Sequence, residues 1–284
     1  IGIASLVMTR AFIFDPPYLR KAKSRIDAVG IGLLVIGIGA LQFVLDKGQQ
    51  DDWFESSLIL GLAILSAVCL IALVIHELTT DEPIVDLRVF KVRSYAVGVF
   101  LMTIVGFVMY GSMVLLPIML QTLLGYPPLQ AGIAMAPRGM GSFFMMPLTG
   151  LMTGRFDSRK LLGGGLVIGG LTMLLLARLN LQAGYWDVFW PQLMQGAGLS
   201  LLFVPLTTVA MDPIPRERMG NATSLFNLMR NIGGSIGIAT TGTLLARHQQ
   251  AFTATLGAHV SAYDQTSRSA FLPLRAGLMA AGAD

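Results

Sequence analysis

Long runs of apolar residues, each about the length of a membrane-crossing helix, recur along this chain between short polar connections. A helix that crosses the hydrocarbon core needs about 20 mostly apolar residues, because no water is present there to satisfy an open backbone. The pattern therefore predicts an all-α, polytopic helical membrane protein. The predicted spans run from Asp27 to Leu45, Leu58 to Ile75, Tyr95 to Leu120, Ala131 to Met152, Leu161 to Leu179, Val188 to Met211 and Gly220 to Ala246.

The composition supports the same class of protein. Of the 284 residues, 13% are charged and 54% are hydrophobic, and the mean hydropathy is +0.68. Soluble domains carry about a quarter charged residues and at most about half apolar ones, so a soluble globular chain is excluded. Cys69 is the single cysteine and lies in an apolar run, so neither a disulfide framework nor a cysteine metal site can form within the chain.

Basic residues are concentrated in alternate connections between the spans. Thirteen of the twenty Lys and Arg residues fall in four connections, at positions 9–25, 76–94, 154–160 and 212–218. Because short basic loops are retained in the cytoplasm, these connections predict the cytoplasmic side, and the acidic 46–55 connection is expected to face outward. Topology thus accounts for the net charge of +4, and no nucleic-acid partner is expected.

Small residues and prolines inside the spans indicate closely packed, bent helices. Gly165 with Gly169, and Gly233 with Gly237, have the four-residue spacing that allows close helix contact. Such pairs serve packing within one bundle or dimerisation, and we favour packing. Prolines within spans kink a helix and are typical of transporters that rock about a site at the membrane midplane. They are Pro117, Pro137, Pro147, Pro191 and Pro205.

Arg230 is the charged residue that lies deepest in a predicted span. It follows about ten residues of the last span, hence about 15 Å of helix, which places it near the bilayer midplane. A charge at this depth is costly and indicates a functional site by default. Asn227 and Asn231 lie on the same side of the helix. This stripe predicts either the wall of an aqueous cavity or a structural knot with a neighbouring helix, and the sequence favours neither.

Three further polar residues are candidates for the cavity. Arg138, in Ala136-Pro137-Arg138-Gly139, lies nearer the outer end of its span, where its side chain could reach the interface. We therefore favour anchoring over substrate contact for Arg138. Gln121 and Gln195 provide neutral donors and acceptors that either contact a substrate or bridge helices.

Residues for proton transfer or metal binding are scarce. No Asp or Glu lies deep in a predicted span, since Asp27 and Asp187 stand at helix ends. Carriers driven by protons use intramembrane carboxylates, so we expect that group outside this chain. His76, His248 and His259 have no metal-ligand spacing. We expect neither an enzyme nor a metal site.

Several strings of residues, which are spread along most of the chain, resemble one family of transporters. They are FDPPYLRK at 14–21, DAVG at 27–30, LDKGQQDDWF at 45–54, LQAG at 129–132, APRG at 136–139 and SLFNLMRNIGGS at 224–235. These strings resemble the EmrB/QacA-type drug:proton antiporters of the major facilitator superfamily, which have fourteen helices. The resemblance implies a major-facilitator-type bundle that is incomplete here, so we expect a fragment of a longer protein.

On this resemblance the chain divides into five segments. We expect the end of a truncated helix and a cytoplasmic linker at 1–25, two central linker helices at 26–76, a cytoplasmic loop at 77–94, five helices of the C-terminal bundle at 95–247, and a polar, extracytoplasmic segment at 248–284.

Residues 150–160 are similar to the cytoplasmic loop motif of the superfamily. This similarity implies a gating role for the residues that match the motif. Gly154 stands where the motif usually has Asp, so the gating role of that carboxylate is not carried over. The matching candidates are Gly150, Arg155, Asp157, Arg159 and Lys160.

The resemblance implies proton-coupled efflux of drugs or other amphipathic or cationic small molecules by alternating access across a bacterial inner membrane. The proton gradient would supply the energy, without a cofactor. The expected partners are the small-molecule substrate and the lipid bilayer, with a periplasmic adaptor and an outer-membrane channel as further candidates. The alternatives are a dedicated exporter of one metabolite, such as a siderophore or an antibiotic, and a channel or non-transporting scaffold. A channel should show repeated pore-lining charges or a filter sequence, and the chain has neither.

Overall fold

The computed structural model describes residues 2–12, 27–80 and 85–259, and this part of the chain is helical without any strand. The predicted all-α polytopic fold is therefore confirmed. The long helices are α1 (Gly2–Phe12), α2 (Ala28–Lys47), α3 (Ser57–Thr79), α4 (Arg93–Ile118), α5 (Pro128–Thr153), α6 (Ser158–Ala177), α7 (Tyr185–Met211) and α8 (Met219–His259). Short turns of 3-10 helix are η2 (Trp53–Glu55), η3 (Leu87–Lys91) and η5 (Arg216–Arg218), and η4 (Met119–Leu123) is a π-helical turn.

Five of the described helices are long and apolar enough to cross a membrane: α2, α3, α4 with its π turn, α6 and α7. Helices α5 and α8 also contain predicted spans, but they are less apolar than these five helices. The difference arises because each carries an arginine in mid-helix, Arg138 in α5 and Arg230 in α8, together with several small or polar residues. These two helices are the ones expected to face a polar interior rather than lipid alone.

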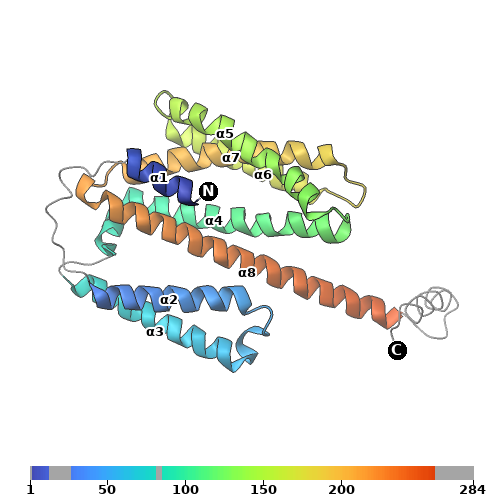
Figure 1. Cartoon of the computed structure of the whole chain (residues 1–284), viewed down its shortest axis with the longest axis horizontal. Coiled ribbons are helices and arrows are strands. Elements are labelled where there is room, and N and C mark those ends of the chain that lie inside the picture. Colours follow the sequence, from blue (N-terminus) through green and yellow to red (C-terminus); the bar gives the residue numbers. More distant parts are fainter. Residues whose placement is uncertain (1, 13–26, 81–84, 260–284) are drawn as a thin grey trace.

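The helices pack as pairs along a common direction (Figure 1). Helix α4 packs along α8, while α5 and α6 both pack along α7, and contacts between α4 and α7 join the two groups. Helices α2 and α3 form a separate hairpin that touches the bundle through α8. At that contact the hydroxyl of Ser235 donates a hydrogen bond to Gln42 Oε1 at 2.7 Å. The described side chains of α1 are all exposed.

The helices approach one another most closely at glycine residues. A Cβ added at Gly233 or Gly237 of α8 would overlap the backbone of Thr103 or Phe107 on α4, and one at Gly165 of α6 would lie 2.8 Å from Leu202 of α7. These contacts lie within one bundle, in agreement with the preference for packing over dimerisation. Gly169 differs from the others, because nothing lies within 4 Å of an added Cβ.

Connections that the sequence analysis assigned to one side of the membrane lie at one end of the bundle. The segments before α4, between α5 and α6, and between α7 and α8 gather at the end where α8 begins, and the connections 48–56, 124–127 and 178–184 lie at the opposite end (Figure 1). Arg218 and Asp86 form an ion pair at 3.3 Å at the first end. The described parts of these three basic connections thus share one end of the molecule, which is the geometry that their predicted cytoplasmic location requires.

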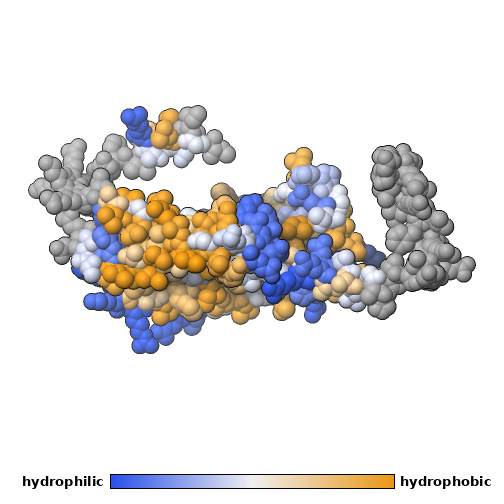
Figure 2. All heavy atoms as spheres, turned by 90° about the horizontal axis from the view of Figure 1, so that it is seen from below, coloured by the Kyte–Doolittle hydropathy of each residue, from blue (hydrophilic) through white to orange (hydrophobic). Residues whose placement is uncertain are grey.

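The α2–α3 hairpin presents an apolar surface to its surroundings. Figure 2 shows this surface as a hydrophobic band with hydrophilic residues beyond its ends. The band includes Leu60, Ile64, Val68, Ile71 and Val74 of α3, each more than two-fifths exposed. Such a band is the outer face of a membrane helix, since lipid solvates it without cost.

Helix α8 continues well past the predicted end of the last span at Ala246. It reaches His259, and residues 247–257 are exposed. This extension is rich in Ala and Gln and contains no proline, so nothing in it ends the helix. The predicted polar segment 248–284 therefore begins as helix, while residues 260–284 and the string at 14–21 lie outside the described residues.

Candidate substrate groove

A groove of about 440 Å³ opens between α4, α5 and α7. Two packed clusters flank it along the bundle. One is built around Tyr95, Met102 and Ala210, and the other around Leu120 and Ala134. On α4 and α7 the groove residues lie between these two clusters in sequence, so the groove sits at mid-depth. The lining residues are Met109, Met113, Met135, Arg138, Gly139, Ser142, Met146, Leu199, Ser200 and Phe203.

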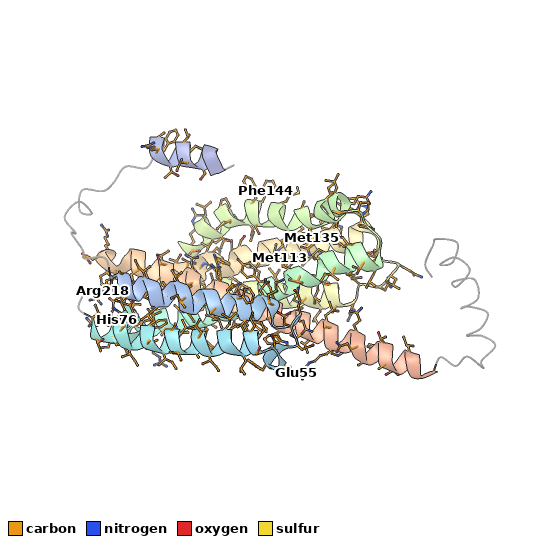
Figure 3. The ribbon with its side chains drawn as sticks, turned by 60° about the horizontal axis from the view of Figure 1, so that its bottom comes forward. Glu55, His76, Met113, Met135, Phe144 and Arg218 are labelled. Atoms are coloured by element: carbon orange, nitrogen blue, oxygen red, sulfur yellow. The ribbon has the colours of Figure 1, made fainter. Side chains whose placement is uncertain are left out.

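Methionine dominates the groove wall. Met113 of α4 and Met135 of α5 are labelled in Figure 3, where they lie between the two helices. Met109 and Met146 complete the set. Methionine is flexible and polarizable, so a wall of this kind adapts to apolar ligands of different shape.

Arg138 is the one charged residue among the described residues that line the groove. Its exposure is only 9%, although the sequence analysis favoured an anchoring position at the membrane interface. Close packing between α5 and α7 fixes its position, since a Cβ at Gly196 would overlap the Arg138 carbonyl and Ser142 Oγ donates to the Gly196 carbonyl at 3.0 Å. Within the described part of the chain the guanidinium forms no ion pair with an acid, and Tyr110 of α4 lies near enough to interact with it electrostatically.

Arg230 reaches the same region from α8. Its guanidinium carbon lies 5.3 Å from the ring centroid of Phe203, a groove residue on α7. Its Nε atom is buried and lacks a hydrogen-bond partner among the described residues. The α8 backbone is held tightly here, because a Cβ at Gly106 of α4 would overlap the Arg230 carbonyl. Arg138 and Phe203 thus both line the groove, and Arg230 lies over the ring of Phe203.

A second cavity, of about 240 Å³, lies between α4, α6 and α7. Its wall is apolar except for Gln195, whose exposure is 4% and whose Oε1 has no partner among the described residues. Met109 and Leu199 line both this cavity and the groove. Gln195 thus belongs to the second cavity rather than to the groove.

The other predicted candidates lie elsewhere. Asn227 Nδ2 donates to the Thr223 carbonyl within α8 at 2.9 Å. Asn231 is exposed, and so is Gln121, which lies in the π turn that follows Pro117. The structure therefore places Arg138 in the groove and Arg230 against the groove residue Phe203, and it leaves the four amide side chains outside the groove.

Comparison with known proteins decides the family. Residues 1–238 match the Major Facilitator Superfamily. This chain belongs to that superfamily. It is 38% identical to the multidrug export protein EmrB of Haemophilus influenzae, over 86% of this chain and 48% of that protein. It is 34% identical to EmrB of Escherichia coli K12, over 96% and 54%, and 36% identical to the fatty acid resistance protein FarB of Neisseria gonorrhoeae, over 84% and 47%.

The expected resemblance to EmrB-type transporters is confirmed by these matches. The chain spans about half the length of the curated relatives that it matches. Membership of the superfamily places the chain in a family of transporters, and its apolar helices together with its bacterial relatives indicate a multi-pass bacterial membrane protein.

The loop that resembles the superfamily motif is exposed at the end of α5 and the start of α6. Gly150 lies in the last turn of α5, and Arg155, Arg159 and Lys160 are exposed. Asp157 caps α6, because its carboxylate accepts a hydrogen bond from the Arg159 N–H at 2.9 Å. The structure thus gives Asp157 a local capping role, and gating by this loop stays a prediction.

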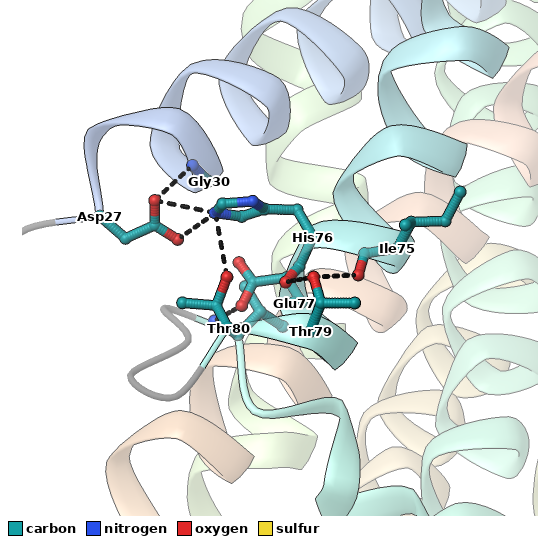
Figure 4. Close-up of polar contacts among 8 residues, drawn as sticks. Asp27, Gly30, Ile75, His76, Glu77, Thr79 and Thr80 are labelled. Carbon is teal, nitrogen blue, oxygen red and sulfur yellow. Dashed lines mark hydrogen bonds and ion pairs between the residues drawn. The ribbon is translucent and has the colours of Figure 1, made fainter.

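Several residues at the end of the α2–α3 hairpin interact with one another and were not among the predicted site residues. Figure 4 shows Asp27 at the start of α2 beside His76 of α3, whose Nε2 lies 2.9 and 3.0 Å from the two carboxylate oxygens. Glu77 is 1% exposed and accepts a hydrogen bond from the Val85 N–H at 3.1 Å. The predicted span ended at Ile75, whereas α3 continues to Thr79 and carries this buried acid inside the helix.

The groove methionines and Phe203 were also missed, because in sequence they read as ordinary apolar span residues. A signal was available for the methionines: four of the 16 in the chain recur on the facing helices α4 and α5 at positions 109, 113, 135 and 146.

Proposed function

We propose that this chain forms the central and C-terminal part of a proton-coupled exporter of drugs or other amphipathic small molecules. The exporter would work by alternating access in a bacterial inner membrane. The observation that carries the proposal is the mid-depth groove between α4, α5 and α7, with its methionine wall and a single buried charge. A site at mid-depth can be opened to either side when two bundles rock about it.

The groove has the properties expected of a site that accepts many substrates. Its volume of about 440 Å³ falls within the range of pockets for drug-sized ligands. Flexible methionine side chains can repack around different apolar bodies, as in other promiscuous binding proteins. Two helices that carry prolines, α5 and α7, form much of its wall, so bending of these helices would change its shape.

Proton coupling requires a group that gains and loses a proton during the cycle. No carboxylate is found among the described residues that line the groove. We therefore propose that the coupling carboxylate lies in the part of the exporter that faces the groove from the opposite bundle, as the sequence analysis expected. A periplasmic adaptor and an outer-membrane channel are proposed as partners on the resemblance alone.

Transport by the complete exporter tests this proposal. In inverted membrane vesicles with an imposed proton gradient, uphill uptake of a lipophilic dye should occur and should stop when the gradient is dissipated. Downhill flux alone would support a channel, and no flux of any dye would support a non-transporting scaffold. Uptake of one metabolite with no uptake of dyes would favour the dedicated exporter.

Arg230→Ala in the complete exporter tests the role of the arginine that lies over Phe203. Removing the charge that stacks on Phe203 should lower uptake at least about tenfold while leaving expression unchanged, and Arg230→Lys should recover only part, since lysine lacks the planar guanidinium. A loss of expression and thermal stability would instead assign Arg230 a structural role. Unchanged uptake by normally expressed Arg230→Ala would remove Arg230 from the proposed cavity.

A further inference from the structure

We propose that the second cavity, between α4, α6 and α7, is a regulatory site for a neutral apolar molecule that carries a hydroxyl group and is dissolved in the bilayer. Gln195 bonds the hydroxyl, and the bound molecule lowers transport through Met109 and Leu199, which this cavity shares with the groove. The site is separate from the substrate groove, and only its effect on transport rests on the proposed function.

The first support is the amide of Gln195. Its side chain lines the cavity at 4% exposure, and its Oε1 atom is buried without a hydrogen-bond partner among the described residues. A buried polar atom without a partner is costly, so a ligand that donates a hydrogen bond to it is favoured. A hydroxyl both donates and accepts, and it can therefore bond either end of an amide.

The second support is the open space beside this amide. Gly169 of α6 lines the cavity and is half-buried, yet nothing lies within 4 Å of a Cβ added to it. The cavity volume of about 240 Å³ exceeds the roughly 150 Å³ of an apolar cavity that binds benzene. The cavity therefore admits a molecule with one or two rings.

The rest of the wall is unsuited to water or an ion. Gln195 is the one polar side chain among the described residues that line the cavity, and its neighbours there include Val105, Met173 and Leu202. An ordered water needs about two to four polar partners, and an ion needs more compensation than one amide provides. The wall therefore suits an apolar body with a single hydroxyl.

The position of the cavity indicates that its ligand comes from the bilayer. Ile104, Val108 and Leu166 line it and are each more than two-fifths exposed, on helices apolar enough to cross a membrane. Gln195 lies ten residues after Tyr185, the first residue of α7, hence about 15 Å along the helix and near the middle of a hydrocarbon core about 30 Å thick. Charged lipid head groups are costly at this depth, whereas a neutral alcohol is not. An acyl chain also reaches it but leaves the amide unbonded.

Two shared side chains connect this cavity to the groove. Met109 of α4 and Leu199 of α7 line both spaces. Because packed side chains move together, a molecule on one side restrains the side chains that a substrate on the other side must displace. The ligand should therefore lower the maximal rate of transport, and a higher substrate concentration should not reverse the effect, since the two molecules occupy different sites.

Direct binding tests the hydrogen bond. The complete exporter in nanodiscs is titrated with radiolabelled naphthylmethanol, and ethylnaphthalene, in which a methyl group replaces the hydroxyl, is the competitor. Naphthylmethanol should bind saturably. Gln195→Met keeps the length of the side chain and should weaken this binding about fivefold to tenfold, as the loss of one hydrogen bond predicts, without weakening the binding of ethylnaphthalene.

A cavity-filling variant tests the location. Gly169→Leu should occupy the space and abolish binding of both compounds, because an added side chain there meets no neighbour at its Cβ. Gly163→Leu is the matched control, since Gly163 lies on the same helix, is equally open at its Cβ and does not line the cavity. In inverted vesicles naphthylmethanol should lower the maximal rate of dye uptake by the wild type and by Gly163→Leu, but not by Gly169→Leu. An alcohol of this kind carries no proton, so the gradient is preserved.

The outcomes separate the alternatives. Absence of saturable binding would overturn the site, as expected if another helix of the exporter covers the cavity. Equal binding of naphthylmethanol by the wild type and by Gln195→Met would also overturn it, as expected if acyl chains fill the cavity, and so would binding that survives Gly169→Leu. Binding without any change in dye uptake would overturn the regulatory effect. Saturable binding to an exporter that moves no dye would instead reject the proposed function and leave the site intact.

Discussion

At the scale of single residues, the contact between Asp27 and His76 ties the two ends of the α2–α3 hairpin together. Asp27 caps α2 by accepting a hydrogen bond from the Gly30 N–H at 2.9 Å, and His76 lies within 3.0 Å of both carboxylate oxygens. The Gly30 N–H lowers the pKa of Asp27 below its ordinary 3.8, burial opposes this effect, and His76 adds to it. The charged carboxylate is therefore the form that stabilises the hairpin.

This direction predicts how stability depends on pH. A carboxyl whose pKa is lowered by folding stabilises the protein above its ordinary pKa, and this contribution is lost as the pH falls through the lowered value. Asp27→Ala should lower the melting temperature in detergent at about pH 7, and the difference from wild type should shrink at about pH 3. His76→Gln, which can still donate to Asp27, should have the smaller effect at neutral pH. A difference that is constant with pH would contradict this account.

At the scale of elements, glycine sets the distance between α4 and α8. Because a Cβ at Gly237 would overlap the backbone of Phe107, Gly237→Ala should force the two helices apart and destabilise the protein by about 1–3 kcal/mol. Gly242 on the same helix has nothing within 4 Å of an added Cβ, so Gly242→Ala should be neutral or slightly stabilising. Thermal unfolding in detergent would measure both variants. Equal melting temperatures for the two would show that the close approach at Gly237 is unimportant.

At the scale of the whole molecule, the two ends of the bundle are predicted to face opposite compartments. In a Cys69→Ser background of the complete exporter, Asp51→Cys should react with an impermeant thiol reagent in intact cells. Arg155→Cys, which is exposed at the other end, should react only after the membrane is opened. Equal labelling of both in intact cells would reject the assignment of sides.

The sequence by itself determined the helices, because the cost of an open backbone in lipid turns each long apolar run into a helix. It also singled out Arg230 by depth. It could not show which residues of different helices meet. Arg138 looked like an interface anchor when its span was considered alone, and Phe203 looked like one apolar residue among many.

Only the tertiary structure determines which residues form the groove. Close contact of α5 with α7 buries Arg138, and the pairing of α4 with α8 carries Arg230 to the ring of Phe203. It also showed that Glu77 is a buried acid, because α3 runs past the end of its apolar stretch and the chain folds back over it at Val85. The apolar pattern of the sequence predicts which segments contact lipid as helices. A site between helices depends instead on contacts among residues that are far apart in the chain. Those contacts arise only when the helices pack.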